Sequence, residues 1–171
     1  AQNHQLMLLH GAQGKGKSTF VRHLLPPELK DYYRNGMISP DNKDHLLQMS
    51  SCLLINLDEF DTLSPARMQE LKSLITQDVM NERKVYDIQN YTFIRRASFI
   101  ASTNNPHCLP DIGENRRILF NTLLEIDYHT PVNHQGIYAQ AYALYRQGFQ
   151  YWYENQEITF LNNRNEAVSY T

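Results

Sequence analysis

The amino-acid sequence predicts an α/β fold built on a largely parallel sheet. Short apolar runs of strand length alternate along the chain with segments of helical periodicity, which is typical of strand–helix–strand units. Polar residues directly follow three of these runs, where the strands should end, and a glycine-rich loop separates the first run from the first helical segment. Strand ends of a parallel sheet share one edge, so we expect a ligand site there.

The composition is that of an ordinary globular domain. The chain has 171 residues, of which 42% are hydrophobic and 20% charged, and this is enough for one domain with a proper core. Its net charge of −2 creates no overall field that would attract nucleic acid or anionic lipid. The two cysteines, Cys52 and Cys108, fit a reducing compartment, and no apolar run is long enough for a membrane span. We therefore expect a cytoplasmic location.

The first strand and the loop after it carry the most specific motif. An apolar run at 6–9 precedes GAQGKGKS at 11–18, which fits the G-x-x-x-x-G-K-[ST] pattern of a phosphate-binding loop. A helical segment, 19–25, follows and stops at two prolines. Backbone N–H groups of such a loop point at phosphate oxygens, and the helix N-terminus adds partial positive charge. The predicted nucleotide-binding residues are Gly11, Ala12, Gln13, Gly14, Lys15, Gly16, Lys17, Ser18 and Thr19.

Two side chains of this loop have separate predicted roles, and together they predict ATP and Mg²⁺ as cofactors. Lys17 would reach the β- and γ-phosphates, and the Ser18 hydroxyl would be a ligand of Mg²⁺. A glycine-rich turn that happens to contain Lys-Ser is the alternative interpretation. The strand before the loop and the helix after it argue against that alternative.

The second strong apolar run, 52–57, ends in two acids and has the form of a Walker B motif. We assign Asp58 to Mg²⁺ and Glu59 as the general base for the attacking water. A solvated acidic turn is the alternative, and Asp61 fits the start of a helix better than a ligand. Before this run we expect a short strand at 37–38 and a helix at 45–50. After it, Ser64-Pro65 opens a helix at 66–75.

A third strand is predicted at 93–102, and Asn104 follows its end. An amide at that point can hydrogen-bond the γ-phosphate or the attacking water, although an Asn after a strand is often only a turn residue. A fourth strand is predicted at 118–126, directly after Arg116-Arg117. Phosphoryl transfer gains from an arginine that reaches the developing charge, often from a partner subunit, but a surface pair is equally compatible. A helix at 136–153 follows.

The segment 81–91 alternates polar and apolar residues, and a turn near Gln89-Asn90 would make it a β-hairpin. Basic residues flank its part from Tyr86 to Tyr91 and would lie near the base of the hairpin: Arg83, Lys84, Arg95 and Arg96. They could contact nucleic-acid phosphates, with tyrosines available for stacking on bases. A charged, solvated face is the simpler account from the residues alone.

These motifs together resemble the virulence-associated protein E (VirE/VapE-like) family. The resemblance rests on the phosphate-binding loop, the Asp-Glu strand end, Ser-Thr-Asn at 102–104 and LPDIGENRR at 109–117, and it covers roughly residues 5–153. The chain departs from the family at Ile112, where Thr is common, and at the extra residue Glu114 before the arginine pair. The family is similar to the superfamily 3 helicases within the AAA+ ATPases.

The resemblance implies a P-loop NTPase three-layer sandwich with a mainly parallel five-stranded sheet in the order 5-1-4-3-2. It implies an ATPase that works as a homo-oligomeric ring on single-stranded or duplex DNA, in a phage or mobile element, often with a primase module in the same chain. Asn104 would be sensor 1, and Arg116 or Arg117 would be an arginine finger acting in trans. The hairpin between Lys72 and Arg96 would face DNA. The helix at 136–153 would pack at the sheet edge or a subunit contact.

We expect an ATPase domain at 1–157 and a tail at 158–171, in a piece of a longer protein, because the chain begins at Ala1 and not at Met. Two other functions are compatible with the loop: a P-loop kinase, or an ATP-binding assembly module without turnover. A kinase needs an acceptor site, and Asn104 with the arginine pair argues against it. An assembly module has no need of a base such as Glu59.

Overall fold

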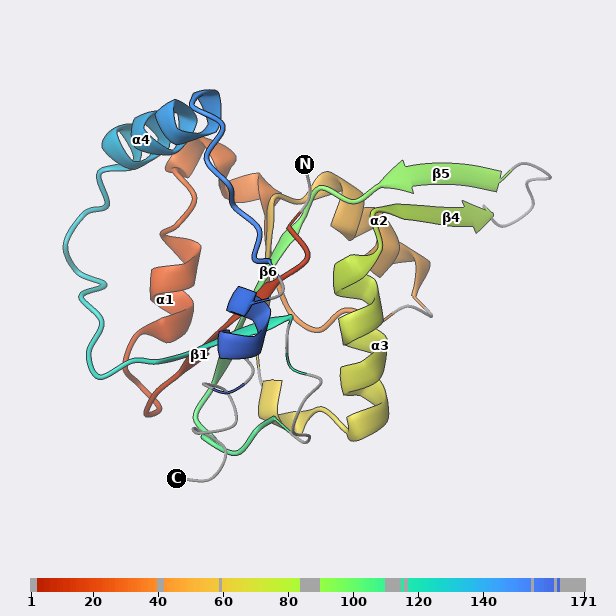
Figure 1. Ribbon diagram of the computed structural model, residues 1–171, viewed down its shortest axis with the longest axis horizontal. Helices are drawn as coiled ribbons and strands as arrows, with labels where there is room; N and C mark the ends of the chain where they lie inside the picture. Colours follow the sequence, from red (N-terminus) through yellow and green to blue (C-terminus); the bar gives the residue numbers. More distant parts are fainter. Residues whose placement is uncertain are drawn as a thin grey trace.

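A five-stranded parallel sheet forms the centre of the computed structural model (Figure 1). The structure describes residues 3–39, 42–58, 60–83, 90–109, 115, 117–154, 156–161 and 163. The strands are β1 (Leu6–His10), β2 (Tyr33–Asn35), β3 (Leu54–Leu57), β6 (Ser98–Thr103) and β7 (Ile118–Thr122). Their spatial order is β2-β3-β6-β1-β7, which is 5-1-4-3-2 when the strands of this sheet are counted along the chain. The fold class and the strand order predicted from the sequence are therefore confirmed.

Helices cover both faces of the sheet, with α1 (Lys17–Arg22) on one side and α3 (Pro65–Thr76) on the other (Figure 1). The remaining helical segments are α2 (Lys43–Ser51), α4 (His134–Arg146) and the 3₁₀ turns η1 (Pro27–Tyr32) and η2 (Phe60–Thr62). A separate antiparallel hairpin consists of β4 (Val79–Arg83) and β5 (Asn90–Ile94), and it projects from the body of the molecule in Figure 1.

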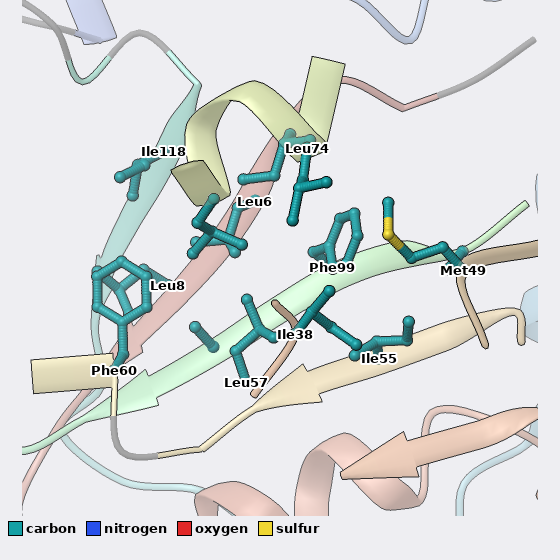
Figure 2. Close-up of a cluster of buried hydrophobic side chains, with 14 of the residues drawn as sticks. Leu6, Leu8, Ile38, Met49, Ile55, Leu57, Phe60, Leu74, Phe99 and Ile118 are labelled. Carbon is teal, nitrogen blue, oxygen red and sulfur yellow. The ribbon is translucent and has the colours of Figure 1, made fainter. Parts of the chain in front are cut away.

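Alternating side chains of the strands pack into two layers, which explains the nearly continuous apolar runs. On one face, Leu6 and Leu8 join Ile55, Leu57 and Phe99 in the main core beneath α3 (Figure 2). On the other face, a smaller cluster contains Leu9, Val21 of α1 and Ile100. α1, α2 and α3 begin one or two residues before the predicted positions 19, 45 and 66. The Ser64 hydroxyl accepts the N–H of Arg67, and Asn42 accepts the N–H of Asp44.

Two strand predictions are wrong. No strand forms at 37–38: β2 lies earlier, at Tyr33–Asn35, where its backbone pairs with β3, and the Ile38 side chain is buried in the core instead. The apolar run at 93–102 is divided between two sheets. The chain leaves β5 at Ile94 and enters β6 at Ser98, because the N–H groups of Arg96 and Ala97 bond the Met49 carbonyl between the two strands.

The C-terminal elements are shorter than predicted. β7 ends at Thr122, four residues before the expected end at Ile126, and α4 ends at Arg146. Gly148, with φ +74°, closes α4: its N–H bonds the Tyr145 carbonyl and the next N–H bonds the Leu144 carbonyl. No residue of α4 is buried, so this helix does not pack on the sheet edge, and the alternative, a subunit contact, stays a prediction. Residues 156–161 are helical and Leu161 is buried, although 158–161 belong to the tail expected from the sequence.

Candidate functional site

The phosphate-binding loop connects β1 to α1 and depends on two glycines with positive φ. Gly14 has φ +78° and Gly16 has φ +79°, which L side chains rarely adopt. α1 begins at Lys17, directly after this loop, and its open N-terminus therefore faces the same space as the loop N–H groups. The sequence motif has the strand, loop and helix that a phosphate cradle requires.

Lys17 lies across the loop in which it is embedded. Its Nζ donates to the Gly11 carbonyl at 2.5 Å and to the Ala12 carbonyl at 2.9 Å. Burial lowers the pKa of Lys17 from its ordinary value, whereas the nearby Asp58 and Asp61 act in the opposite direction. Burial and the charge of Lys17 also lower the pKa of His10, the last residue of β1. His10 is thereby favoured in its neutral form, which limits repulsion next to the lysine.

The Asp58 carboxylate is held at the end of β3 by groups from three neighbouring elements. The Ser102 hydroxyl of β6 donates to Oδ1 at 2.9 Å, and the Ser18 hydroxyl of α1 lies 3.4 Å from the same oxygen. The Asn35 amide of β2 donates to Oδ2 at 3.2 Å, and the buried Asn56 amide donates to Asn35 at 2.7 Å. Oxygen ligands of this kind are those that Mg²⁺ prefers, so Ser18 and Asp58 fit the ion.

Ser102 and Asn35 were not identified from the sequence. β3 and β6 are in register with Leu57 opposite Ala101, so the next residues, Asp58 and Ser102, are neighbours. Asn35 is opposite Asn56 in the pairing of β2 with β3. The only available signal was the position of Ser102 two residues before Asn104, on the same expected strand end.

An open cleft of about 670 Å³ lies above the loop and the strand ends. It is lined by Gln13, Gly14, Lys15, Gly16, Lys17, Ser18, Thr19, Asp58, Asp61, Thr62, Ser102, Thr103, Asn104 and Tyr128. The structure thus brings together Lys17, Ser18, Asp58 and Asn104, as the sequence predicts. Asp61 also lines the cleft, from the first turn of η2. Glu59, the predicted base, is outside the described residues.

Arg117 lies at the end of the sheet where the strands begin, whereas the cleft lies at the end where the strands finish. Its carbonyl accepts the N–H of Leu6, the first residue of β1, whereas the phosphate loop follows the last residue of β1. A strand of this length spans about 17 Å, so Arg117 is far from the cleft of its own chain. Its guanidinium donates to the Lys72 carbonyl at 3.2 Å and lines a second cavity of about 410 Å³ with Tyr151, Trp152 and Tyr153. Arg116 is outside the described residues.

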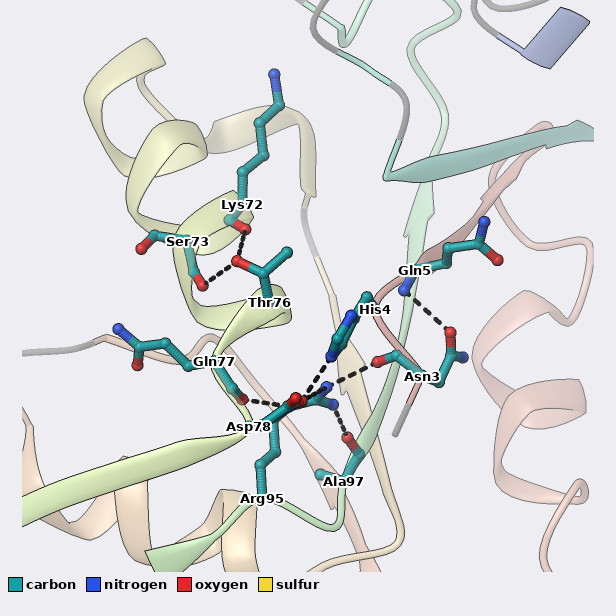
Figure 3. A network of polar contacts seen from close by, with 10 residues as sticks. All are labelled: Asn3, His4, Gln5, Lys72, Ser73, Thr76, Gln77, Asp78, Arg95 and Ala97. Carbon is teal, nitrogen blue, oxygen red and sulfur yellow. Dashed lines mark hydrogen bonds and ion pairs between the residues drawn. The ribbon is translucent and has the colours of Figure 1, made fainter. Parts of the chain in front are cut away.

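The predicted contact of Arg95 with nucleic acid is wrong, because this side chain is buried and hydrogen-bonded to backbone carbonyls (Figure 3). It is 1% exposed and donates from Nε to Gln77, from Nη1 to Ala97 and from Nη2 to Asn3, each through a backbone carbonyl at 2.6–2.8 Å. These bonds connect the base of the hairpin to the end of α3, to the residue before β6 and to the N-terminal segment. Its guanidinium is therefore not available to a phosphate.

The sequence suggested that the basic residues lie near the base of the hairpin, but Arg83 and Arg96 do not lie together there. Arg96 is exposed beside Arg95, at the base. The backbone of Arg83 ends β4 at the far end of the hairpin, opposite Asn90, and Lys84 is outside the described residues. The predicted antiparallel hairpin is confirmed, but Asn90 belongs to β5 and not to the turn.

The parallel sheet and the glycine loop at its edge define a P-loop NTPase domain. The chain belongs to the virulence-associated protein E-like domain family, whose model matches residues 1–170. A comparison with curated protein sequences found no match.

Two solved structures have a similar fold. One, the apo C-terminal region (305–718) of NrS-1, is 16% identical with a TM-score of 0.51, covering 98% of this chain and 36% of that one. The other, the A form of the same apo region, is 15% identical with a TM-score of 0.50, covering 98% and 35%. The chain thus spans about a third of the length of these structures.

No helix in the described residues is long and apolar enough to cross a membrane.

Proposed function

We propose that this domain binds and hydrolyses ATP with Mg²⁺ and serves as the ATPase subunit of a helicase-like DNA motor of a phage or mobile element. The observation that carries the proposal is the position of the Ser18 hydroxyl beside the Asp58 carboxylate, at one end of a cleft whose floor is the phosphate-binding loop. Membership of the virulence-associated protein E-like family supports it.

Different groups of the cleft are proposed to bind the phosphates and the metal ion. The loop N–H groups and the N-terminus of α1 receive the phosphates, and Lys17 exchanges its two carbonyl partners for β- and γ-phosphate oxygens. Ser18 and Asp58 would hold Mg²⁺, which neutralises charge on the same phosphates. Ser102 and Asn35 fix both Asp58 oxygens by hydrogen bonds and so keep the carboxylate oriented.

The remaining assignments concern the attacking water. Glu59 follows Asp58 in the chain and is proposed to take its proton. Asn104 lines the cleft at the end of β6 and is proposed to hydrogen-bond the γ-phosphate or the water. The arginine finger is proposed to come from a neighbouring subunit of a head-to-tail ring, because Arg117 lies at the end of the sheet away from its own cleft. DNA would contact the hairpin, and a primase module in the same polypeptide is part of the proposal.

The test is binding and hydrolysis of Mg²⁺·ATP by Lys17→Ala, with Lys30→Ala as the matched control, because Lys30 is exposed on η1 and away from the cleft. Lys17→Ala should weaken binding or abolish turnover, and Lys30→Ala should behave as wild type. Glu59→Gln should bind ATP and not hydrolyse it. Hydrolysis by Lys17→Ala at the wild-type rate, measured with and without single-stranded DNA, would refute the loop assignment.

A further inference from the structure

The ring of Tyr128 lies directly against the phosphate-binding loop, a contact that the roles assigned above do not use. A Cβ added to Gly16 would overlap ring atoms of Tyr128, so the glycine lets the ring approach the loop backbone. Tyr128 lines the same cleft as Lys17, Ser18 and Asp58. The other described residues that line this cleft are glycine, charged or polar. Tyr128 thus provides the aromatic surface among the described walls of the cleft.

The segment that carries Tyr128 is fixed in place at several points. After β7, the Leu123 N–H bonds the His10 carbonyl at 2.8 Å, which keeps the chain beside the start of the loop. Asp127 then accepts the N–H groups of His129 and Thr130 at 3.0 Å and the Thr130 hydroxyl at 2.5 Å, and these bonds lower the pKa of Asp127. The His129 ring lies 4.1 Å from the Tyr128 ring, centroid to centroid. Tyr128 is therefore held by a formed turn.

The same segment then runs along α1 to α4 (Figure 1). The His134 ring nitrogen Nε2 donates to the His23 carbonyl at 2.7 Å, and the Tyr138 hydroxyl donates to the Leu24 carbonyl at 3.2 Å. Both acceptors lie just past the end of α1. The connection thus contacts the loop before α1 through Tyr128, and α4, which follows it, contacts the chain just past the end of α1. These contacts at both ends make the position of Tyr128 a property of the fold.

The strand order decides which part of a nucleotide would meet Tyr128. β1 lies between β6 and β7. The metal-side groups, Asp58 and Ser102, come from β3 and β6, so they occupy the space on one side of the loop. We therefore expect a nucleotide with its phosphates on the loop to extend its ribose and base toward the other side, where the connection after β7 places Tyr128. Nucleotide pockets combine such an aromatic wall with a few polar groups, and 670 Å³ is within their usual size.

We propose that Tyr128 forms the nucleoside-side wall of the cleft and packs its ring against the adenosine part of bound ATP. The inference rests on the proposed function, that this cleft binds ATP. An aromatic wall accepts any base through its ring, so it adds affinity for the nucleoside without adding affinity for the phosphates. The phenol hydroxyl is not part of the contact that we propose.

The experiment compares two ligands, Mg²⁺·ATP and Mg²⁺·tripolyphosphate, by titration calorimetry on the whole 171-residue chain. The variants are Tyr128→Ala, Tyr128→Phe and, as the matched control, Tyr142→Ala, which removes an exposed tyrosine from α4. Tyr128→Ala should weaken ATP binding by about 5- to 150-fold, the usual range for loss of one aromatic contact with a base. Its tripolyphosphate affinity should stay within about twofold of wild type, and the other two variants should bind both ligands as wild type does.

Three results would overturn the inference. The first is unchanged or tighter ATP binding by Tyr128→Ala. The second is an equal loss of affinity for ATP and for tripolyphosphate, which would mean that the ring only supports the loop. The third is a loss of ATP affinity in Tyr128→Phe as large as that in Tyr128→Ala. Binding of neither ligand by the wild-type chain would instead refute the proposed function, and this inference with it. Binding of both ligands by the wild type with no effect of Tyr128→Ala would leave the proposed function in place and refute only the role of Tyr128.

Discussion

Ser102 holds the Asp58 carboxylate from the neighbouring strand, by a hydrogen bond of 2.9 Å. Removal of that hydroxyl leaves Asp58 in place but frees its Oδ1 to rotate away from Ser18. Groups that orient a metal ligand in this way typically account for 10- to 100-fold in metal affinity. We therefore expect Ser102→Ala to raise the Mg²⁺ concentration for half-maximal ATP hydrolysis by about tenfold.

The measurement is an Mg²⁺ titration at saturating ATP. Ser98→Ala, at the start of the same strand and away from the cleft, is the control and should not change the Mg²⁺ requirement. An unchanged requirement in Ser102→Ala would mean that Asp58 is oriented without Ser102.

Arg95 and Arg96 are adjacent in the chain and have opposite roles. Arg95 is buried and bonds three carbonyls, whereas Arg96 is exposed. Arg95→Ala leaves those three carbonyls without their donor and creates a cavity, so we expect the free energy of unfolding to fall by about 3 kcal/mol. Arg96→Ala should change it by less than about 0.5 kcal/mol. Urea denaturation of the two variants checks this, and equal losses would contradict the structural role of Arg95.

The β4–β5 hairpin is an element that projects from the body of the molecule (Figure 1). Val79 and Ile94 are paired across the two strands and are 50% and 58% exposed. A protruding hairpin of this kind suits a contact with DNA through backbone phosphates. With Arg95 excluded, the cations left to the hairpin are Arg83, Lys84 and Arg96.

If the hairpin contacts DNA, Arg83→Gln with Lys84→Gln should weaken single-stranded DNA binding and reduce the slope of log K against log salt by about one for each lost phosphate contact. ATP binding should stay the same, because the cleft is elsewhere. Lys30→Gln with Arg146→Gln removes two cations from η1 and α4 and is the matched control. An unaltered salt slope would assign the hairpin cations to a solvated face.

The phosphate loop lies at the end of the sheet where the strands finish, and Arg117 lies at the end where they begin. This arrangement suits a head-to-tail assembly. In such a ring, the arginines of one subunit would face the phosphates of the next. Replacement of both Arg116 and Arg117 by Ala should leave ATP binding intact and reduce hydrolysis by about 10³-fold or more, the usual contribution of an arginine finger.

A mixing experiment tests whether the arginines act between subunits. Arg116→Ala/Arg117→Ala subunits have intact cleft residues, and Glu59→Gln subunits have intact arginines. Mixed rings should therefore recover part of the activity that each variant lacks alone. No recovery, in a preparation shown by mass spectrometry to contain mixed rings, would mean that the arginines do not complete a neighbouring site.

Local sequence determined the phosphate loop, the Asp58 strand end and the alternation that makes the sheet parallel. These features depend on consecutive residues: the glycines at 14 and 16 permit positive φ, and apolar runs of strand length form strands wherever they can be buried on both faces. The strand order required more than pattern, and it was predicted through the family resemblance. The same local logic failed at 93–102, where one continuous run serves two different sheets.

Tertiary structure alone decided which distant side chains meet. Strand register places Ser102 beside Asp58, and the turn at Asp127 places Tyr128 on Gly16. Arg95 shows the same dependence in the opposite direction: its sequence context suggests a surface cation. In the structure it is buried, and the end of α3, the residue before β6 and the N-terminal segment supply three carbonyl acceptors. The physical reason is that register, burial and hydrogen-bond partners are set by how elements pack together. The partners of Asp58, Gly16 and, at Gln77 and Asn3, Arg95 lie far from them in the sequence.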